Sequence, residues 1–258
     1  MLLHLSDLHF GTEKSECVHA IQQFCWEQQP EMVVVSGDLT QRARLRQFFA
    51  CRQFLDSLKT PYLVVPGNHD IPLYHVWDRF LTPFMSYQAF FSAPERELES
   101  EHFYVIGVNS VRRRYHTRGH ISLTQIQQIQ QKLSEAPANK LKIIVTHQPF
   151  YTPPGDPHGV KDCPVLGKMA LELWSQQQLF ALLHGHLHQA VVYDLNQIYQ
   201  LQATHPVLDI QAGTATSWRL HNNIPNGFNV IHPNHQIEHY IYQEQQQRFV
   251  WERNWNLG

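Results

Sequence analysis

The amino-acid sequence predicts an α/β fold. Short, wholly apolar segments alternate with stretches in which apolar residues recur at helical spacing. Strands that are apolar at every position are typical of sheets buried on both faces, which is the arrangement found in α/β proteins. The chain has 258 residues, of which 43% are hydrophobic and 16% are charged, so it can build a large core. We predict a single domain over residues 1–258, because no linker, repeat or low-complexity block divides the sequence.

The N-terminal part of the chain contains three predicted strands, at residues 2–5, 32–35 and 62–65. Each strand ends in polar residues or glycine. Between the first two strands, Cys17 and Ile21 begin a helical apolar face. Between the second and third, another helix is predicted to place one set of apolar residues on one side: Leu45, Phe48, Phe49, Leu55 and Leu58.

Three further buried strands are predicted at residues 103–108, 141–145 and 179–183. Ser122 and Gln125 have the spacing of a capping box, which begins a helix between the first two of these strands. This helix continues the alternation of strands and helices that predicts the fold class.

The segment at about 72–101 is predicted to be an aromatic helical insertion that packs on the sheets. Its aromatic residues are Trp77, Phe80, Phe84, Tyr87, Phe90 and Phe91. An alternative function for this insertion is a lid over an acyl chain.

From about residue 189 the sequence becomes rich in short predicted strands separated by turn residues. The predicted strands are 191–195, 198–201, 207–211, 228–232, 237–242 and 249–251. This spacing predicts an antiparallel meander in the C-terminal third.

Five of the predicted strands end in residues that can bind a metal. Seven candidate ligands follow these strands: Asp7, His9, Asp38, Asn68, His147, His186 and His188. Carboxylate, amide and imidazole ligands suit Mn, Fe, Co or Zn, and the lack of cysteine among them argues against a structural zinc site. Alternate positions of an extended chain project to the same side, so the pairs at 7 and 9 and at 186 and 188 can each reach one centre.

Seven ligands exceed the needs of one four-coordinate metal and suit two metals that share a bridging ligand. Two divalent cations beside Asp7 and Asp38 leave a positive charge, which a hydroxide and a phosphodiester would balance. Paired metals lower the pKa of a bridging water and hold both the attacking and the leaving oxygen. His69 is then available as a general acid for the departing alkoxide.

Taken together, these motifs resemble the signature of the calcineurin-like metallophosphoesterases. The resemblance covers residues 2 to about 215 and rests on five motifs: Asp7-x-His9, Gly37-Asp38, Gly67-Asn68-His69-Asp70, His147 and Gly185-His186-x-His188. It implies a four-layer αββα sandwich of two mixed β-sheets with a dinuclear metal site on the loops. Mn and Fe are the metals that we favour among Mn, Fe, Zn and Co.

The resemblance also implies a role for each candidate residue. The first metal would be bound by Asp7, His9, Asp38 and His188. The second would be bound by Asp38, Asn68, His147 and His186, so that Asp38 bridges the two metals. His69 and Asp70 are the predicted catalytic residues, with Asp70 orienting His69, and Asn68 and His69 are predicted to bind the substrate.

Within the family, Leu5–His9, Gly37–Thr40 and the step from Asp70 to His147 look most similar to the class III cyclic-nucleotide phosphodiesterases. We therefore predict that a cyclic nucleotide or a related small phosphodiester is attacked by a hydroxide bridging two metals. Three alternatives remain: a UDP-diacylglucosamine-type pyrophosphate hydrolase, a DNA-repair-type nuclease of the same family, and a non-catalytic scaffold. The net charge of -2 fits duplex DNA poorly.

The remaining sequence features predict a cytoplasmic protein. Neither a signal peptide nor an apolar run of about 18 residues is visible, and the four cysteines are predicted to be reduced thiols. The basic run Arg112–Arg114 is predicted to be a solvated loop, and the alternative is that it guides an anionic substrate to the mouth of the site. His158 and His184 lie near predicted ligands, but we assign neither a role. The sequence is compatible with a monomer or with a homodimer through the C-terminal strands.

Overall fold

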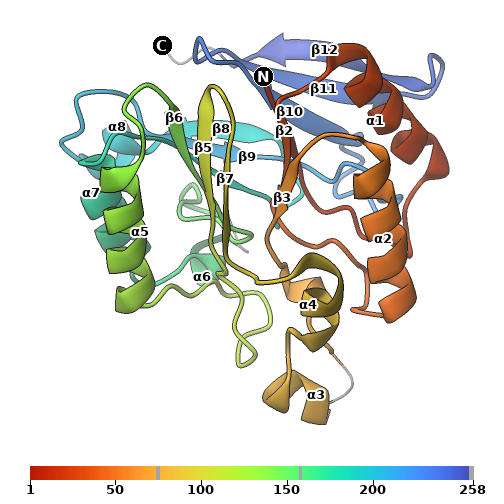
Figure 1. The fold of residues 1–258 in the computed structure, drawn as a ribbon, viewed down its shortest axis with the longest axis horizontal. Coiled ribbons are helices and arrows are strands. Elements are labelled where there is room, and N and C mark those ends of the chain that lie inside the picture. The colour runs from red at the N-terminus through yellow and green to blue at the C-terminus, as the bar shows by residue number, and fades with distance from the viewer. Residues whose placement is uncertain (74–75, 157–158, 256–258) are drawn as a thin grey trace.

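Two β-sheets pack face to face, and helices cover the outer face of each sheet (Figure 1). The computed structural model describes residues 1–73, 76–156 and 159–255. Within this part of the chain, each sheet has six strands and each is mixed, with parallel and antiparallel neighbours. The predicted α/β fold, a four-layer sandwich, is confirmed.

The first sheet has the strand order β12-β11-β10-β1-β2-β3. Its parallel strands are β1 (Leu2–Leu5), β2 (Met32–Val35) and β3 (Tyr62–Val64). The antiparallel strands β10 (Gly227–Ile231), β11 (Ile237–Gln243) and β12 (Arg248–Asn254) extend the sheet beyond β1. The helices α1 (Ser15–Gln28) and α2 (Leu45–Ser57) lie against its outer face, on the right in Figure 1.

The second sheet has the order β4-β5-β6-β7-β9-β8. Its four parallel strands are β5 (Phe103–Gly107), β6 (Leu141–Val145), β7 (Leu179–His184) and β9 (Leu208–Gln211). Antiparallel edge strands β4 (Arg96–Glu99) and β8 (Val191–Asp194) complete it. The helices α5 (Leu123–Glu135), α7 (Gly167–Ser175) and α8 (Leu195–Tyr199) cover its outer face.

The core between the two sheets explains why the central strands are mostly apolar. Leu2 and Val34 of the first sheet belong to the same buried cluster as Val105, Ile143 and Leu183 of the second. Alternate residues of these strands point outward and pack beneath the helices. Each central strand is therefore buried on both faces, and the few polar residues within these strands, such as His4 and Lys142, are themselves buried.

The C-terminal strands differ from the predicted single meander. Residues 195–199 form α8, and the predicted strand at 198–201 is wrong. The side chain of Asp194 accepts a hydrogen bond from the backbone N–H of Asn196 at 2.9 Å, which caps the helix. β8 and β9 also join the second sheet, and β9 runs parallel to β7, so only β10–β12 form the antiparallel meander.

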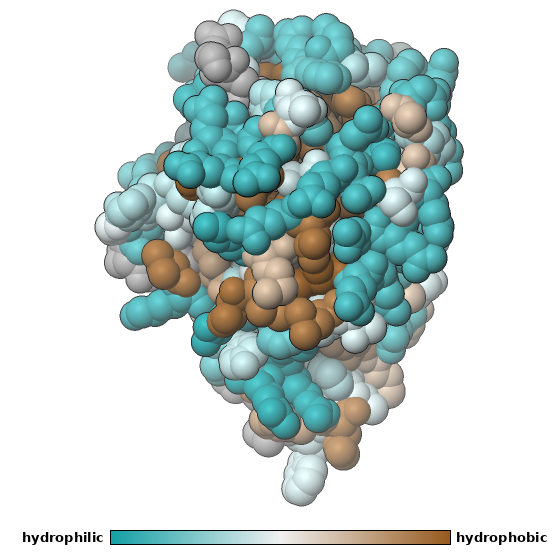
Figure 2. All heavy atoms as spheres, turned by 90° about the vertical axis from the view of Figure 1, so that its left-hand side faces the viewer, coloured by the Kyte–Doolittle hydropathy of each residue, from teal (hydrophilic) through white to brown (hydrophobic). Residues whose placement is uncertain are grey.

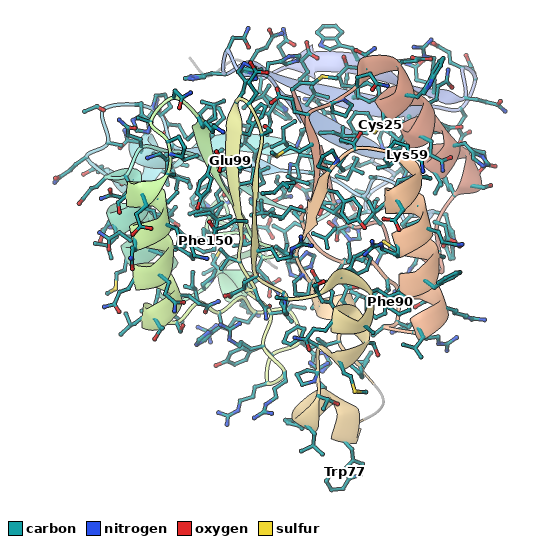
Figure 3. The ribbon with its side chains drawn as sticks, viewed as in Figure 1. Cys25, Lys59, Trp77, Phe90, Glu99 and Phe150 are labelled. Atoms are coloured by element: carbon teal, nitrogen blue, oxygen red, sulfur yellow. The ribbon has the colours of Figure 1, made fainter. Side chains whose placement is uncertain are left out.

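The segment at 72–101 contains α3 (Val76–Leu81), α4 (Met85–Phe91) and the unpredicted strand β4. In α4, Tyr87 and Phe91 are buried against Phe48 of α2. Trp77 of α3 is 80% exposed and points away from the protein body at the tip of this segment (Figure 3). The two halves of the segment thus differ, with α4 packed and α3 projecting.

The predicted apolar face of α2 is partly wrong, because two of its residues are exposed. Leu45 and Phe49 are 60% and 54% exposed, whereas Phe48, Cys51 and Leu55 are buried. Successive residues of a helix are rotated by about 100°, and Phe49 lies on the side of α2 that faces away from the sheet. The buried face of α2 therefore follows 48, 51 and 55.

The outer face over α5 and α7 is not uniformly polar. Figure 2 views the molecule from this side, and apolar side chains gather near the middle of the view. Leu123, Val165 and Met169 are exposed apolar residues of these helices and of the segment before α7. Among the described residues, no helix is long and apolar enough to cross a bilayer.

None of the four cysteines is in a disulfide bond, which agrees with the predicted reduced thiols. Cys17, Cys25 and Cys51 are buried in the layer between α1, α2 and the first sheet. Burial raises the pKa of the Cys25 thiol to about 12, because the thiolate would lose its hydration there. These thiols act as apolar packing groups.

Candidate metal centre and active site

The candidate ligands come together where loops leave the carboxyl ends of five parallel strands. Asp7 and His9 follow β1, Asp38 follows β2, Asn68 lies in a short helical turn after β3, His147 follows β6, and His186 and His188 follow β7. Three of these loops come from one sheet and two from the other, and they meet across the sandwich. For example, the backbone N–H of His186 donates to Oδ2 of Asp7 at 3.1 Å.

One group of ligand atoms surrounds Oδ1 of Asp7. The Nε2 atoms of His188 and His9 lie 3.1 Å and 3.6 Å from this oxygen. The two imidazole Nε2 atoms are 3.2 Å apart, and Nε2 of His9 is 3.8 Å from Oδ2 of Asp38. Four ligands at about 2.1 Å from one tetrahedral metal stand about 3.4 Å from one another. The spacing of this first group fits a common metal ion.

A second group surrounds Nε2 of His147. This nitrogen lies 3.4 Å from Oδ1 of Asp38, 3.0 Å from Oδ1 of Asn68 and 3.3 Å from Nδ1 of His186. The same spacing argument applies to this second group. The two carboxylate oxygens of Asp38 are thus divided between the groups, with Oδ2 in the first and Oδ1 in the second.

The backbone at these positions is strained. Asp7, His9, Asp38, His186 and His188 all have φ between 47° and 71°, in the left-handed region. Non-glycine residues rarely adopt this conformation, and the surrounding structure must compensate for its cost. The clustering of five such residues among seven candidate ligands shows that the loops are shaped to aim these side chains at a common centre.

Two glycines let the loops approach one another closely. A Cβ atom on Gly67 would overlap the side chain and backbone of Asp38. A Cβ atom on Gly185 would overlap Ser6 and the carboxylate of Asp7. Both positions therefore require glycine for the close approach of backbone to a ligand side chain.

The electrostatics of the cluster suit cations. Burial opposes ionisation of Asp7, but the imidazole of His188 holds the pKa of this carboxyl well below its usual value. Burial likewise disfavours the charged form of His147, yet Asp38 raises its pKa to about 9. Oδ1 of Asp7 is buried and accepts no hydrogen bond of good geometry from the described residues. A buried carboxylate oxygen in this state fits a metal ion, and the oxygen and nitrogen donors fit Mn, Fe, Zn or Co.

His69 lies at the edge of this cluster. Its ring meets the ring of His9 edge to face, with the centroids 5.0 Å apart. Nδ1 of His69 lies 3.0 Å from the backbone oxygen of Gln41 and 3.3 Å from the side-chain nitrogen of the same residue. The backbone oxygen makes the shorter contact and can only accept a hydrogen bond. Nδ1 therefore carries a proton, and Nε2 is the nitrogen available for proton transfer.

Asp70 contributes in a different way. Its buried carboxylate accepts hydrogen bonds from the backbone N–H groups of Gly67, Leu39 and Thr40 at 2.8–3.0 Å, and from the Thr40 hydroxyl at 2.9 Å. Burial and the nearby charge of Asp38 raise the pKa of Asp70 to about 6. These contacts join the loops after β2 and β3, whereas the ring of His69 is held by Gln41.

Two cavities, of about 280 and 370 Å³, flank the cluster. The smaller is lined by His9, Gln41, His69, His188, Arg219, Leu220 and His221. The larger includes Asp38, Asn68, Asp156, Asp162, His186 and Gln189. His221 lines both cavities, so they adjoin at the ligand cluster.

Several of these lining residues were not predicted as part of the site, among them Gln41, Asp162, Arg219 and His221. Gln41 lies just after the Gly37–Thr40 motif, so proximity in sequence was a weak signal for it. Asp162, at the end of a short helix, and His221, in a loop, follow no recognisable sequence pattern. Only the folded structure places them beside the ligands.

Two features noted in the sequence, the basic run Arg112–Arg114 and His184, lie outside the cluster. Arg112 donates to Gln125 and to backbone oxygens of its own loop, whereas Arg113 and Arg114 are exposed. His184 is buried with its Nε2 atom 3.0 Å from Asp209. His158 lies outside the described residues.

The sequence model of the calcineurin-like phosphoesterase family matches residues 1–190. The chain belongs to this family. The matched segment includes every candidate ligand from Asp7 to His188. The family resemblance inferred from the motifs is confirmed, including its likeness to phosphodiesterase relatives.

Three relatives of this calcineurin-like phosphoesterase are phosphodiesterases by name. It is 33% identical over 81 residues to glycerophosphodiester phosphodiesterase GpdQ of Enterobacter lignolyticus, covering 27% of this chain and 29% of the relative. It is 25% identical to a probable GpdQ of Arcobacter nitrofigilis, covering 69% and 63%. The matched region thus spans less than two thirds of the length of each of these two GpdQ relatives. The 3′,5′-cyclic adenosine monophosphate phosphodiesterase CpdA of Escherichia coli is 23% identical, covering 76% and 72%.

Solved structures share the phosphoesterase fold at low identity. A purple acid phosphatase from yellow lupin seeds aligns with a TM-score of 0.67 at 13% identity, covering 98% of this chain and 53% of that one. A dimetal phosphatase from Danio rerio aligns with a TM-score of 0.59 at 13% identity, covering 94% and 92%. Vacuolar Protein Sorting 29 from Cryptosporidium parvum aligns at 0.50 and 14%, covering 99% and 97%. These likenesses establish the fold alone.

Proposed function

We propose that this phosphoesterase is a dinuclear metal-dependent phosphodiesterase that hydrolyses a small phosphodiester. One observation carries the proposal: the carboxylate of Asp38 lies between two ligand groups, with Oδ1 3.4 Å from His147 and Oδ2 3.8 Å from His9. A carboxylate shared in this way is suited to bridge two metals. The proposed first metal is bound by Asp7, His9, Asp38 and His188, and the second by Asp38, Asn68, His147 and His186.

Divalent metals, with Mn and Fe favoured, would act as Lewis acids on the phosphoryl oxygens and lower the pKa of a coordinated water. The chain's own residues supply the remaining functions. Asp7 and Asp38 provide two negative charges and leave the centre cationic, so that it attracts an anionic phosphodiester. Oδ1 of Asn68 lies 3.0 Å from Nε2 of His147, which leaves the Asn68 amide nitrogen to donate a hydrogen bond to the phosphate.

His69 is the proposed proton donor. The backbone oxygen of Gln41 accepts from its Nδ1, so a proton on Nε2 can be transferred to the leaving alkoxide. The contacts of Asp70 support a positioning role, since its carboxylate joins the loop of His69 to the loop of Asp38. We therefore propose His69 as the catalytic acid and Asp70 as the residue that fixes its loop.

The substrate is proposed to be a 3′,5′-cyclic nucleotide or a glycerophosphodiester. The names of the CpdA and GpdQ relatives support these two classes. Cavities of about 280 and 370 Å³ on two sides of the cluster give each substituent of a small diester its own space. Arg219, in the smaller cavity, can bind an anionic group of the substrate.

Two structural observations bear on the alternatives. Trp77 projects from the tip of the insertion, whereas a lid over an acyl chain would place its aromatic residues on the cavity. The scaffold alternative is weakened because the full set of candidate ligands, together with His69, converges in one place. The reduced and mostly buried cysteines support the proposed cytoplasmic location.

The test is hydrolysis by chelator-treated protein with and without Mn²⁺. Three substrates are compared: bis(p-nitrophenyl) phosphate, 3′,5′-cyclic AMP and glycerophosphoethanolamine. Mn²⁺-dependent cleavage of the chromogenic diester supports the proposed chemistry, and the two natural diesters decide the substrate class. If the protein binds Mn²⁺ but cleaves none of the three, the phosphodiesterase proposal is wrong.

A further inference from the structure

The two candidate metal groups differ in charge. The first group contains the carboxylate of Asp7 and one oxygen of the Asp38 carboxylate. The second group contains only the other oxygen of the Asp38 carboxylate. Its other ligands, Asn68, His147 and His186, are neutral when they bind a metal. A divalent ion in the second group would therefore be held by less negative charge, unless a residue beyond the ligands contributes.

Asp162 occupies the position where such a contribution can be made. It lies at the end of the short helix α6 (Gly159–Asp162), and its side chain is buried beside the second group. Oδ2 of Asp162 is 2.9 Å from Nε2 of His186. The backbone oxygen of Asp162 also accepts a 2.6 Å hydrogen bond from Gly119, which fixes the residue to the neighbouring loop.

This contact determines which nitrogen of His186 can bind a metal. A carboxylate accepts hydrogen bonds, so Nε2 of His186 carries the proton and Nδ1 carries the lone pair. Nδ1 is also the atom that lies 3.3 Å from Nε2 of His147, inside the second group. His147 has the opposite arrangement, because its Nδ1 atom lies 2.8 Å from the backbone oxygen of Ser36 and its Nε2 atom faces the group.

We propose that Asp162 is a positioning residue that secures the second metal through His186. It holds the ring in the tautomer that binds through Nδ1, and its negative charge makes that nitrogen a stronger ligand. Loss of a carboxylate behind a metal-binding histidine typically weakens metal affinity by about 10–100-fold. The inference rests on the proposed dinuclear function, since it assigns a role within the second group.

The experiment compares Mn²⁺ binding to wild-type protein and to Asp162→Asn by the EPR signal of free Mn²⁺. Asparagine keeps the size of the side chain but removes the charge, and its amide can favour either tautomer. We expect the affinity of the second equivalent to fall about 10–100-fold and that of the first to stay within about twofold. Saturating Mn²⁺ should restore kcat, a result that misfolding would not give. Asp156→Asn, which changes another acidic residue lining the same cavity, is the matched control and should leave both affinities unchanged.

The outcomes separate the inference from the function on which it rests. If wild-type protein binds fewer than two Mn²⁺ ions, the dinuclear function fails. If wild-type protein binds two and Asp162→Asn binds both with unchanged affinity, or loses both equally, only the role of Asp162 is overturned. Should the variant fail to fold, ¹⁵N NMR of histidine-labelled wild-type protein loaded with Zn²⁺ remains decisive. It should show His186 protonated at Nε2, and protonation at Nδ1 would refute the inference.

Discussion

The backbone N–H of His69 donates a 2.8 Å hydrogen bond to Oδ1 of Asp38. The proposed proton donor and the proposed bridging ligand are therefore joined directly, across loops that follow different strands. Asp70 reinforces this junction by accepting from Gly67 on one loop and from Thr40 on the other. The same loops place the ligands and the acid, but the Asp38 carboxylate and the His69 ring have different proposed roles. Substitutions of these two side chains can therefore separate metal binding from proton transfer.

Replacing Asp38 should affect both metals. Asp38→Asn keeps an oxygen that can accept from the His69 amide but removes the negative charge shared by the two groups. We expect fewer than two bound metals per chain and a fall in the diesterase rate of at least about 10³-fold, equivalent to several kcal/mol of transition-state stabilisation. Metal analysis after gel filtration and initial rates with Mn²⁺ measure the two effects. Two tightly bound metals in this variant would rule out the bridging role.

Replacing His69 should leave the metals in place. His69→Ala is expected to lower the rate for a substrate with an alkoxide leaving group by about 10²–10⁴-fold, the range for loss of a general acid. The loss should be much smaller for bis(p-nitrophenyl) phosphate, because p-nitrophenolate departs without protonation. The ratio of the two losses is the measurement. Equal losses with both substrates would mean that His69 binds the phosphate and transfers no proton.

The close approach at Gly185 gives a steric test of the first metal group. In Gly185→Ala, the new methyl group would overlap Ser6 and the carboxylate of Asp7. We expect displacement of Asp7 and a loss of metal affinity of about 10-fold or more, comparable to other disturbances around metal ligands. Gly213→Ala is the matched control, because its methyl group would come no closer than 3.6 Å to His188. Isothermal titration with Mn²⁺ should show a loss for the first variant only.

His239 should make the metal-free protein less stable in acid. Burial lowers the pKa of its imidazole to about 4, although Glu252 partly opposes this shift. Between pH 6.5 and 4 the unfolded chain binds a proton that the folded protein does not, so stability falls as the pH falls through this window. The contribution of His239 is up to about 3 kcal/mol.

The measurement is urea unfolding at pH 7.5 and 5 in the presence of chelator. Asn229 accepts a 2.9 Å hydrogen bond from His239, and His239→Asn can retain a donor to it. The free energy of unfolding of this variant should change less between the two pH values than that of the wild type. Burial also lowers the pKa of His4 to about 3. His4 is present in both proteins, so it contributes equally to the pH dependence of their free energies of unfolding. An identical pH dependence in both proteins would contradict the assignment to His239.

Much of the sandwich could be predicted because its central strands are buried on both faces. Residues 32–35 are apolar without interruption, and residues 2–5 and 141–145 each contain one polar residue, His4 and Lys142. All three segments stop at polar residues, so both their type and their ends were visible in sequence. Edge strand β4 contains three charged residues in Arg96–Glu99 and has no such pattern. The helix α8 was predicted as a strand because its five residues are too few to show helical periodicity.

The ligand groups could be predicted because each ligand follows a strand in a short motif. The residues that act on these ligands have no such signature. Asp162 reaches His186 from a different loop, and Gln41 holds His69 through its backbone oxygen, which no side-chain pattern reveals. Contacts of this kind are products of tertiary structure and appear only when the loops are placed together.

The most direct test of the dinuclear phosphodiesterase is a titration of metal-depleted protein with Mn²⁺ while hydrolysis of bis(p-nitrophenyl) phosphate is followed. If Asp38 joins two metals that act together, the rate should remain low through the first equivalent, rise with the second and then level off. Full activity after one equivalent would contradict the two-metal account. No activity at any concentration of Mn²⁺ that fills the site would contradict the proposed phosphodiesterase function itself.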